Sequence, residues 1–139
     1  MMLAIDASVA TKWLLPEEHS AQAASVNARR FDLVAPELLI VEVANLLRKR
    51  QRRGELALNQ VGTLIDSLTS LPIRLVSHLG LVKAALVLSA RLDHGLHDCV
   101  YLATAVAESC RMVTADRRLH DILEQSPLAG LTMWIEDVP

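Results

Sequence analysis

Four acidic residues in this sequence have neighbours that set them apart from ordinary surface acids. Asp6 directly follows the apolar run "MLAI", and Asp116 comes two residues after "RMVT". Glu42 interrupts the apolar stretch "LLIVEVANLL", and Asp98 begins "DCVYLATAVAESC". If the fold brings them together, their mutual repulsion raises their pKa values unless a cation neutralises it. Carboxylate oxygens in that number suit Mg²⁺ or Mn²⁺, which can activate a water for phosphodiester hydrolysis.

Each of these acids also has a purely structural explanation. Asp6, Asp98 and Asp116 stand where helices are expected to begin, and Asp is a common N-cap residue. Glu42 would lie on the polar stripe of an amphipathic helix, together with Asn45 one turn further on. In the functional alternative, Glu42 points into a polar cleft with Asn45 beside it. The residues alone leave both explanations open.

The elements that must position these acids are predicted by short apolar runs bounded by turn residues. Such runs predict strands at 2–5, 32–35, 73–76, 111–114 and 132–135. Helical patterns lie between them, at 8–15, 17–30, 36–53, 55–71, 79–92, 98–109 and 115–125. Strands that alternate with helices are typical of a parallel sheet covered on both faces. In such a sheet the functional crevice lies beyond the carboxyl ends of the strands, where the strand order switches.

Length and composition agree with one globular domain, which we expect to span residues 1–139. The net charge of −2 does not indicate a nucleic-acid-binding protein, but "RKRQRR" (48–53) contains five of the 14 basic residues. Aromatic residues make up only 3% of the chain, which is too few for a platform that stacks single-stranded bases.

No segment predicts export or membrane insertion. The N-terminus lacks the positive stretch before an apolar run that a signal peptide needs, and the longest apolar-rich segment is too short to span a bilayer. Cys99 and Cys110 are not in a C-x-x-C spacing, and their apolar surroundings favour buried thiols of a reducing cytoplasm. We therefore expect a cytoplasmic protein with no membrane contact.

Four segments resemble the PIN-domain family, in particular the VapC-type toxins of bacterial toxin–antitoxin pairs. They are "MLAIDASVATKWLLPEE", "APELLIVEVANLLRKR", "GLHDCVYLATAVAE" and "MVTADRRL". Each segment alone is weak, but four in the right order and spacing are specific and cover essentially the whole chain. The resemblance implies a three-layer α/β/α sandwich around a mainly parallel sheet.

The resemblance also implies an activity, its residues and its partners. The activity is RNA hydrolysis that depends on Mg²⁺ or Mn²⁺. By position, the acidic site of the family falls on Asp6, Glu42, Asp98 and Asp116. Supporting polar groups fall on Ser8, Asn45 and Thr114. The family further implies a homodimer, and inhibition by a cognate VapB-type antitoxin whose tail covers the cleft.

Within the stretch "LDHGLHDC" (92–99), the resemblance singles out Asp98 as the functional residue. The family often has Tyr-Asp-Ala where this chain has His97-Asp98-Cys99, a departure that keeps the acid. We interpret His94 as part of the exit of the preceding helix. A zinc site built from His94, His97 and Cys99 is disfavoured, because no further Cys or His pair at ligand spacing completes it.

Two binding surfaces and one rival function follow as hypotheses. We expect the RNA backbone to be held by five basic residues: Arg48, Lys49, Arg52, Arg53 and Arg117. The ordinary alternative is that the basic run 48–53 is simply the solvent-exposed end of a helix. The antitoxin would bind along the helices at 36–53 and 55–71, so that replacing Leu64 or Leu68 with Asp would weaken the complex. The rival function is a PIN-like binding module without turnover, against which the four intact acids argue.

Overall fold

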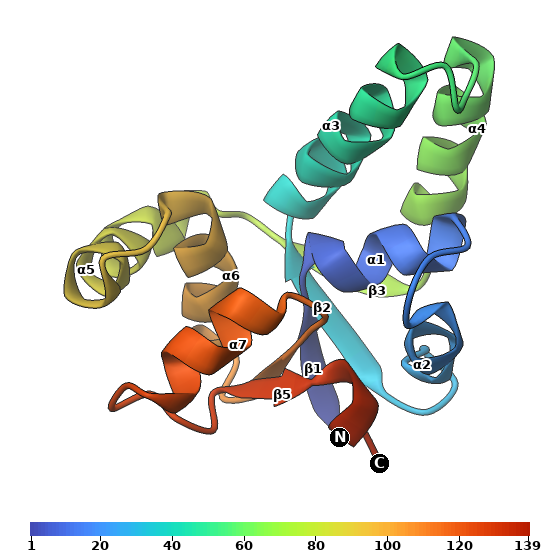
Figure 1. The fold of residues 1–139 in the computed structure, drawn as a ribbon. Coiled ribbons are helices and arrows are strands. Elements are labelled where there is room, and N and C mark those ends of the chain that lie inside the picture. Colours follow the sequence, from blue (N-terminus) through green and yellow to red (C-terminus); the bar gives the residue numbers. More distant parts are fainter.

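Five parallel strands form the centre of the computed structural model, which describes all residues 1–139 (Figure 1). In the order of the sheet they are β3 (Ile73–Val76), β2 (Asp32–Pro36), β1 (Met2–Ile5), β4 (Arg111–Thr114) and β5 (Thr132–Trp134). Every neighbouring pair is parallel. The predicted parallel sheet is confirmed, with β2 one residue longer and β5 one residue shorter than the apolar runs indicate.

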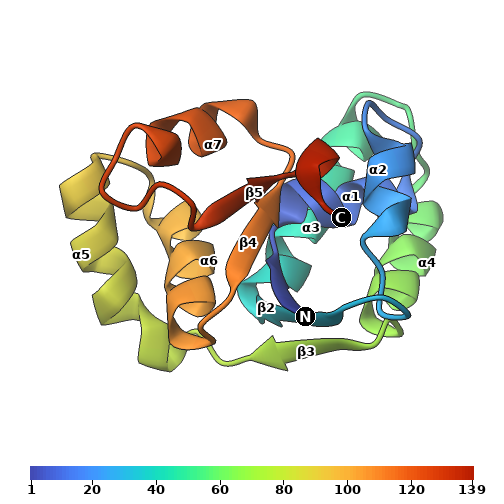
Figure 2. The same cartoon turned by 90° about the horizontal axis from the view of Figure 1, so that it is seen from below.

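Helices connect the strands and cover both faces of the sheet. They are α1 (Ala7–Leu14), α2 (Ser20–Ser25), α3 (Leu38–Arg52), α4 (Leu58–Thr69), α5 (Val82–Leu92), α6 (Leu96–Ala107) and α7 (Arg117–Glu124), with the short 3₁₀ helices η1 (Leu79–Leu81) and η2 (Ile135–Asp137). One face is covered by α6, with α5 outside it, and the other by α1 and α2 (Figures 1 and 2). The three-layer α/β/α arrangement is therefore confirmed.

The core lies on both sides of the sheet because alternate side chains of a strand point to opposite faces. In β1, Ala4 packs into the cluster that contains the α6 residues, whereas Leu3 and Ile5 pack with α1 and α2. All three side chains are buried. Burial on both faces explains why the strands read as continuous apolar runs rather than as alternating patterns.

The strand order switches between β1 and β4. From β1 the chain builds outward through β2 to β3, and then returns to the other side of β1 with β4 and β5. Asp6 follows β1 directly, and Asp116 follows β4 after one intervening residue. The carboxyl ends of these two adjacent strands therefore meet where an open parallel sheet has its crevice.

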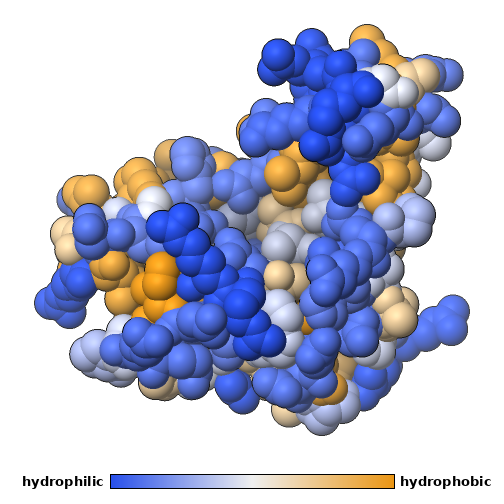
Figure 3. All heavy atoms as spheres, in the orientation of Figure 1, coloured by the Kyte–Doolittle hydropathy of each residue, from blue (hydrophilic) through white to orange (hydrophobic).

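A hairpin of α3 and α4 extends beyond the carboxyl ends of the strands (Figure 1). The space-filling view shows a notch between this hairpin and the part of the molecule formed by α5, α6 and α7 (Figure 3). The crevice at the strand ends is thus walled by helices from both halves of the sequence. No helix in the structure has the length and apolar character needed to cross a membrane.

Two helix predictions are wrong in extent. The helix expected over 17–30 is limited to α2, because the left-handed backbone of His19 (φ 66°) precedes it and turns follow it at 27–30. The helix expected to begin at Asp98 begins at Leu96, with Gly95 as its N-cap. Asp98 therefore lies in the first turn of α6 and does not cap it.

Candidate active site

Asp6 stands at the switch point with both carboxylate oxygens hydrogen-bonded. The backbone N–H of Val9 donates to Oδ1 at 3.1 Å, which caps α1, and the Ser8 hydroxyl donates to the same oxygen at 2.6 Å. The Thr114 hydroxyl donates to Oδ2 at 2.6 Å. Burial raises the pKa of Asp6 to about 6, because these hydrogen bonds only partly offset the loss of water and the charge of Asp98 opposes ionisation. Asp6 is thus a helix cap and also a carboxylate held in an unfavourable environment.

Two hydroxyl groups connect the end of β1 to the end of β4. The Thr114 Oγ1 that donates to Asp6 also accepts the backbone N–H of Asp116 at 3.0 Å. The Ser8 Oγ accepts the backbone N–H of Ala115 at 2.9 Å. Because both hydroxyls also bond Asp6, they fix the two strand ends, and the acids that follow them, relative to each other.

Asp116 and Asp98 each use one carboxylate oxygen in an internal hydrogen bond and keep the other available. In Asp116, Oδ1 accepts the backbone N–H of Leu119 at 3.1 Å and so caps α7. In Asp98, Oδ2 lies 2.6 Å from Nε2 of His94. Asp116 therefore does cap a helix, but its second carboxylate oxygen remains available to another partner. Asp98 does not cap a helix.

His94 is a neighbour of the site that the sequence interpretation missed. Its side chain is 13% exposed, whereas that of Asp98 is 39% exposed. The chain leaves α5 through Asp93, whose left-handed backbone (φ 49°) caps the helix, and His94 then turns back onto the first turn of α6. The spacing of four positions between His94 and Asp98 is the only signal in the sequence, and it does not predict a contact because His94 lies before the start of α6.

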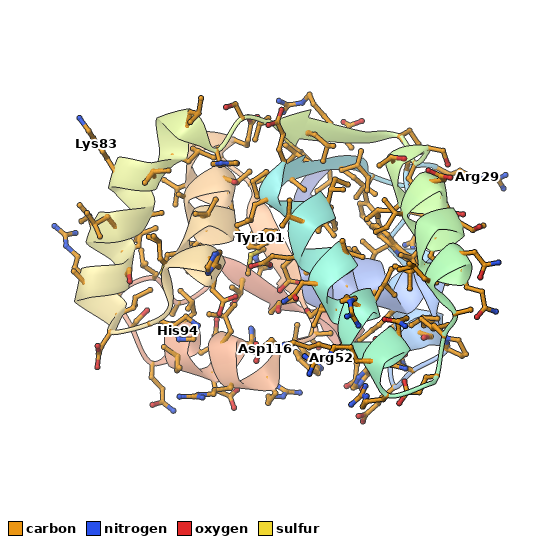
Figure 4. All side chains as sticks on the ribbon, turned by 90° about the horizontal axis from the view of Figure 1, so that it is seen from above. Arg29, Arg52, Lys83, His94, Tyr101 and Asp116 are labelled. Carbon is orange, nitrogen blue, oxygen red and sulfur yellow. The ribbon has the colours of Figure 1, made fainter.

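Asp98 interacts electrostatically with Asp6 and with Glu42, and all three carboxylates act on the buried Tyr101. Burial raises the pKa of the half-buried Glu42, and the charge of Asp98 adds to this, while Tyr101 and His97 lower it. Burial and the three carboxylates raise the pKa of Tyr101 far above its usual value. The hydroxyl lies near Glu42, but it makes no hydrogen bond of acceptable geometry to any protein group. Tyr101 lies between α6 and α3 at the centre of the view from above (Figure 4).

Asn45 does not share this environment. It lies one turn beyond Glu42 on α3 and is exposed. The cleft explanation therefore suits Glu42, whereas the polar-stripe explanation suits Asn45. Tyr101 comes from α6 and was not predicted as a site residue, because nothing in the sequence brings it to Glu42, which lies far away along the chain.

The residues present fit a divalent cation that is held largely through water. No three Asp, Glu, His or Cys side chains are arranged as a ready-made metal cage. Mg²⁺ commonly takes one or two carboxylates and keeps several waters, so it does not require such a cage. Burial raises the pKa values of Asp6 and Glu42, so a bound cation would favour their ionised forms. Cys99 is a poor ligand, because burial raises the pKa of its thiol to about 11.

Basic side chains flank the acidic site on two sides. Next to Asp116, the guanidinium of Arg117 lies 3.7 Å from the ring centroid of Trp134, a contact that restrains it. The other predicted basic residues are exposed along the last turns of α3: Arg48, Lys49, Arg52 and Arg53. Three of these four line an open hollow of about 430 Å³. The hydrophilic surface at the tip of the α3–α4 hairpin is visible in Figure 3.

Comparison with known sequences agrees with this geometry. The PIN domain matches residues 3–124 of the chain. The chain is also 30% identical over 121 residues to Ribonuclease VapC3 of Pyrobaculum aerophilum, which covers 86% of this chain and 92% of that protein. The chain therefore belongs to the PIN-domain family, as a member of its VapC type, and the resemblance drawn from the four sequence segments is confirmed.

Solved structures of low sequence identity share the fold. The structure of PAE2754 from Pyrobaculum aerophilum superimposes with a TM-score of 0.73 at 19% identity, covering 98% of this chain and 85% of that chain. A toxin–antitoxin complex from Klebsiella pneumoniae has a TM-score of 0.69 at 12% identity, with 98% and 99% coverage. VapC20 of Mycobacterium tuberculosis, described as a sarcin-ricin loop cleaving toxin, has a TM-score of 0.64 at 13% identity, with 83% and 88% coverage.

Proposed function

We propose that this chain is an endoribonuclease that hydrolyses RNA phosphodiester bonds with the help of Mg²⁺ or Mn²⁺. The observation that carries the proposal is the cluster of acids at the switch in strand order, where Thr114 bonds both Asp6 and the backbone of Asp116, and where the charge of Asp98 acts on Asp6 and Glu42. Carboxylates that repel one another at such a place favour a cation, and a cation favours a phosphate. The name of the curated relative, a ribonuclease, supports RNA as the substrate.

The four acids have complementary roles in this proposal. Asp6, Asp98 and Asp116 would hold the cation directly or through water, and Glu42 would either hold a second ion or orient the attacking water. When bound, the divalent ion supplies an activated water and stabilises the leaving oxygen. No side chain acts as a nucleophile. Ser8 and Thr114 keep the Asp6 carboxylate in one orientation, and the expected products carry a 5′-phosphate and a 3′-hydroxyl.

The basic residues on either side of the acids would hold the RNA backbone. Arg117 is restrained by Trp134 next to Asp116, and Lys49, Arg52 and Arg53 line the hollow at the end of α3. Arg48 is exposed on the same helix and would add to the attraction. Contacts of this kind position the backbone without reading the bases. The nuclease is therefore expected to select RNA largely by shape.

The partners in this proposal are a VapB-type antitoxin and a second copy of the chain, in the cytoplasm. One of the similar folds is part of a toxin–antitoxin complex, which supports an antitoxin as a partner of this chain. Three exposed apolar side chains on η1 and α5 support a homodimer, since such a patch favours burial against another surface: Leu79, Val82 and Leu86.

Of the two leucines expected to bind the antitoxin on α4, the structure leaves only Leu64 accessible to a partner. Leu64 lines a shallow pocket of about 350 Å³ together with Leu15 and Leu56, so an apolar side chain of a partner can reach it. Leu68 is buried in the core and is not available to a partner. Replacing Leu68 with Asp would therefore unfold the protein and would not report on the complex.

Cleavage of purified total RNA by the antitoxin-free chain tests the proposed activity. Reactions with Mg²⁺, with Mn²⁺ and with EDTA separate metal-dependent hydrolysis from contaminating ribonuclease. Discrete fragments that appear only with metal, and that carry 5′-phosphates, support the proposal. A folded chain that binds antitoxin and cuts no RNA with either metal would instead favour the rival function, a binding module without turnover.

A further inference from the structure

A basic pocket between α1 and α3 lies next to the acidic site, and it shares Lys49 and Arg53 with the hollow at the end of α3. It has a volume of about 370 Å³, and its charged lining residues are Lys12 and Glu17 on one side and Lys49, Arg50 and Arg53 on the other. We call it the α1–α3 pocket. A second pocket, of about 290 Å³ between α1, α2 and α4, contains no charged side chain. The lining of the α1–α3 pocket instead suits an anion.

The α1–α3 pocket is continuous with the acidic site through Ser8. Ser8 lines the pocket, and its hydroxyl donates to Asp6 at 2.6 Å. Lys12 lies four residues further along α1, on the same face of the helix and about 6 Å along its axis. That step is comparable to the separation of neighbouring phosphates along a nucleic-acid strand. An RNA strand with one phosphate at the acidic site can therefore place its neighbouring phosphate at Lys12.

The cations of the pocket are held in position by two carboxylates, which balance only part of their charge. Glu17 contacts both Lys12, at 3.4 Å, and Arg50, and so fixes these two side chains in the wall. Glu55 pairs with both Arg53, at 3.3 Å, and Arg50, at 3.5 Å, and lies outside the pocket lining. Lys49 makes no ion pair. Two carboxylates, Glu17 in the lining and Glu55 just outside it, thus face four cations, and the remaining positive charge attracts an anion.

Lys12 is unlike the exposed basic residues at the end of α3. Its side chain is only 13% exposed and comes from a different helix, so it is not explained as part of a solvated basic run. A cation so shielded from water interacts more strongly with an anion than an exposed one does. The pocket contains no aromatic side chain, so it offers contacts to a backbone and none that stack on bases.

We propose that the α1–α3 pocket binds the RNA phosphate next to the one that is cleaved, with Lys12 as its positioning residue. This inference rests on the proposed ribonuclease function. The acids that bind the cation repel the rest of the RNA, and the pocket offsets this repulsion one nucleotide away. It thereby sets the register in which the strand crosses the acids.

The test uses a short RNA with one mapped cleavage site and removes single charges from both molecules. Methylphosphonate linkages neutralise one phosphate at a time on either side of that site. The protein variant is Lys12→Met, which keeps the apolar stem of the side chain. Its control is Arg29→Met, which removes a charge at an exposed edge of the molecule away from Tyr101 (Figure 4).

One neutral linkage adjacent to the cleaved bond is expected to lower kcat/KM by about 10-fold or more in the wild type, as the loss of a charge-assisted hydrogen bond would. The same linkage should cause no further loss in Lys12→Met, and should retain its full effect in Arg29→Met. RNA binding in EDTA gives a readout apart from catalysis. There, Lys12→Met should reduce the salt slope by about 0.7, the value for one single-strand phosphate contact.

Three results would overturn the inference. In the first, Lys12→Met keeps the full penalty for every neutral linkage and the wild-type salt slope. In the second, Lys12→Met leaves RNA binding unchanged but weakens binding of the antitoxin, which would make the pocket a site for acidic protein side chains. In the third, Lys12→Met binds RNA in EDTA as tightly as the wild type does. Failure of the wild type to cleave any RNA would instead count against the proposed function. The RNA-binding measurement in EDTA does not depend on cleavage, so it tests the pocket separately from the nuclease activity.

Discussion

Thr114 donates a hydrogen bond of 2.6 Å to Asp6 across 108 positions of the sequence. The same hydroxyl oxygen accepts the backbone N–H of Asp116 at 3.0 Å. One buried side chain therefore orients an acid at the end of β1 and the backbone that presents another acid after β4. Thr114 therefore fixes the positions of Asp6 and Asp116 relative to each other at the switch in strand order.

Thr114→Val is expected to impair both stability and RNA cleavage. It removes a donor from a buried carboxylate, which should cost about 1–3 kcal/mol in the free energy of unfolding. It also raises the pKa of Asp6 further, because the Thr114 hydrogen bond lowers it. The pH profile of cleavage should therefore move to higher pH. Denaturant unfolding and a pH series of cleavage rates measure the two effects.

Thr104→Val is the matched control for this change. Thr104 is also buried, but its hydroxyl bonds only the carbonyl of Val100 in its own helix, at 2.9 Å. Its replacement should leave the pH profile where it is. If both variants shift the profile equally, the Thr114–Asp6 bond does not set the ionisation of Asp6.

Asp6→Asn is expected to stabilise the metal-free protein at neutral pH. Burial raises the pKa of Asp6 from its ordinary value of 3.8 to about 6 in the folded chain, so ionisation of Asp6, the loss of its proton, opposes folding. The stability that this proton contributes is complete below the unfolded value and is lost as the pH rises through about 6. In EDTA at pH 7, the variant should gain on the order of 1–3 kcal/mol over the wild type.

Unfolding curves between pH 4 and pH 7 test the sign of this effect. The advantage of Asp6→Asn should shrink as the pH falls, and added Mg²⁺ should stabilise the wild type more than the variant. Asp32→Asn serves as the control, because Asp32 is exposed at the opposite end of the sheet. An advantage that stays constant with pH would contradict the assignment of a raised pKa to Asp6.

His94→Ala is expected to weaken cleavage without abolishing it. His94 contacts Asp98 at 2.6 Å and holds one of its oxygens, while the other remains available. Loss of a partner that orients a metal-binding carboxylate typically costs 10–100-fold, roughly, in metal affinity or activity. Metal titrations of cleavage should show a higher half-saturating Mg²⁺ concentration. His97→Ala, at an exposed neighbour of Asp98, should have a clearly smaller effect; equal effects would remove His94 from the site.

Sequence patterns predicted the strands, and the positions of Asp6 and Asp116 after them, better than they predicted the surroundings of the acids. Apolar runs are dictated by burial on both faces of the sheet, so they mark β1 and β4 clearly, and with them Asp6 and Asp116. The contact of His94 with Asp98 depends on the left-handed backbone of Asp93, which no local pattern announces. The approach of Glu42 to Tyr101 depends on how α3 lies relative to α6, which no local sequence pattern determines.

The same limit applies to helix ends and helix faces. The charge pattern over 17–30 is consistent with a helix, but the backbone of His19 and the turns after Ser25 restrict it to α2. Leu64 and Leu68 both lie on α4, yet only the structure separates the residue that lines a pocket from the one in the core. Helical periodicity alone cannot tell a surface that packs internally from one that meets a partner.

Leu79→Asp is expected to convert the proposed homodimer to a monomer. Leu79 is 82% exposed on η1, beside the exposed Leu86 of α5, and a charge there cannot be buried against a second copy. Sedimentation velocity of the antitoxin-free protein measures the change. Leu58→Asp is the control, because Leu58 is similarly exposed but lies on the α3–α4 hairpin. A Leu79→Asp variant that remains dimeric would place the interface elsewhere.

The most direct test of the central claim is single-turnover cleavage of a short RNA by three proteins under one saturating Mg²⁺ concentration. These are the wild type, Asp98→Asn and Asp32→Asn, each shown to be folded by its unfolding curve. The acidic site predicts cleavage by the wild type and by Asp32→Asn, and loss of cleavage in Asp98→Asn with RNA binding retained. Equal cleavage by all three proteins, or cleavage that persists in EDTA, would contradict a metal-dependent site at these acids.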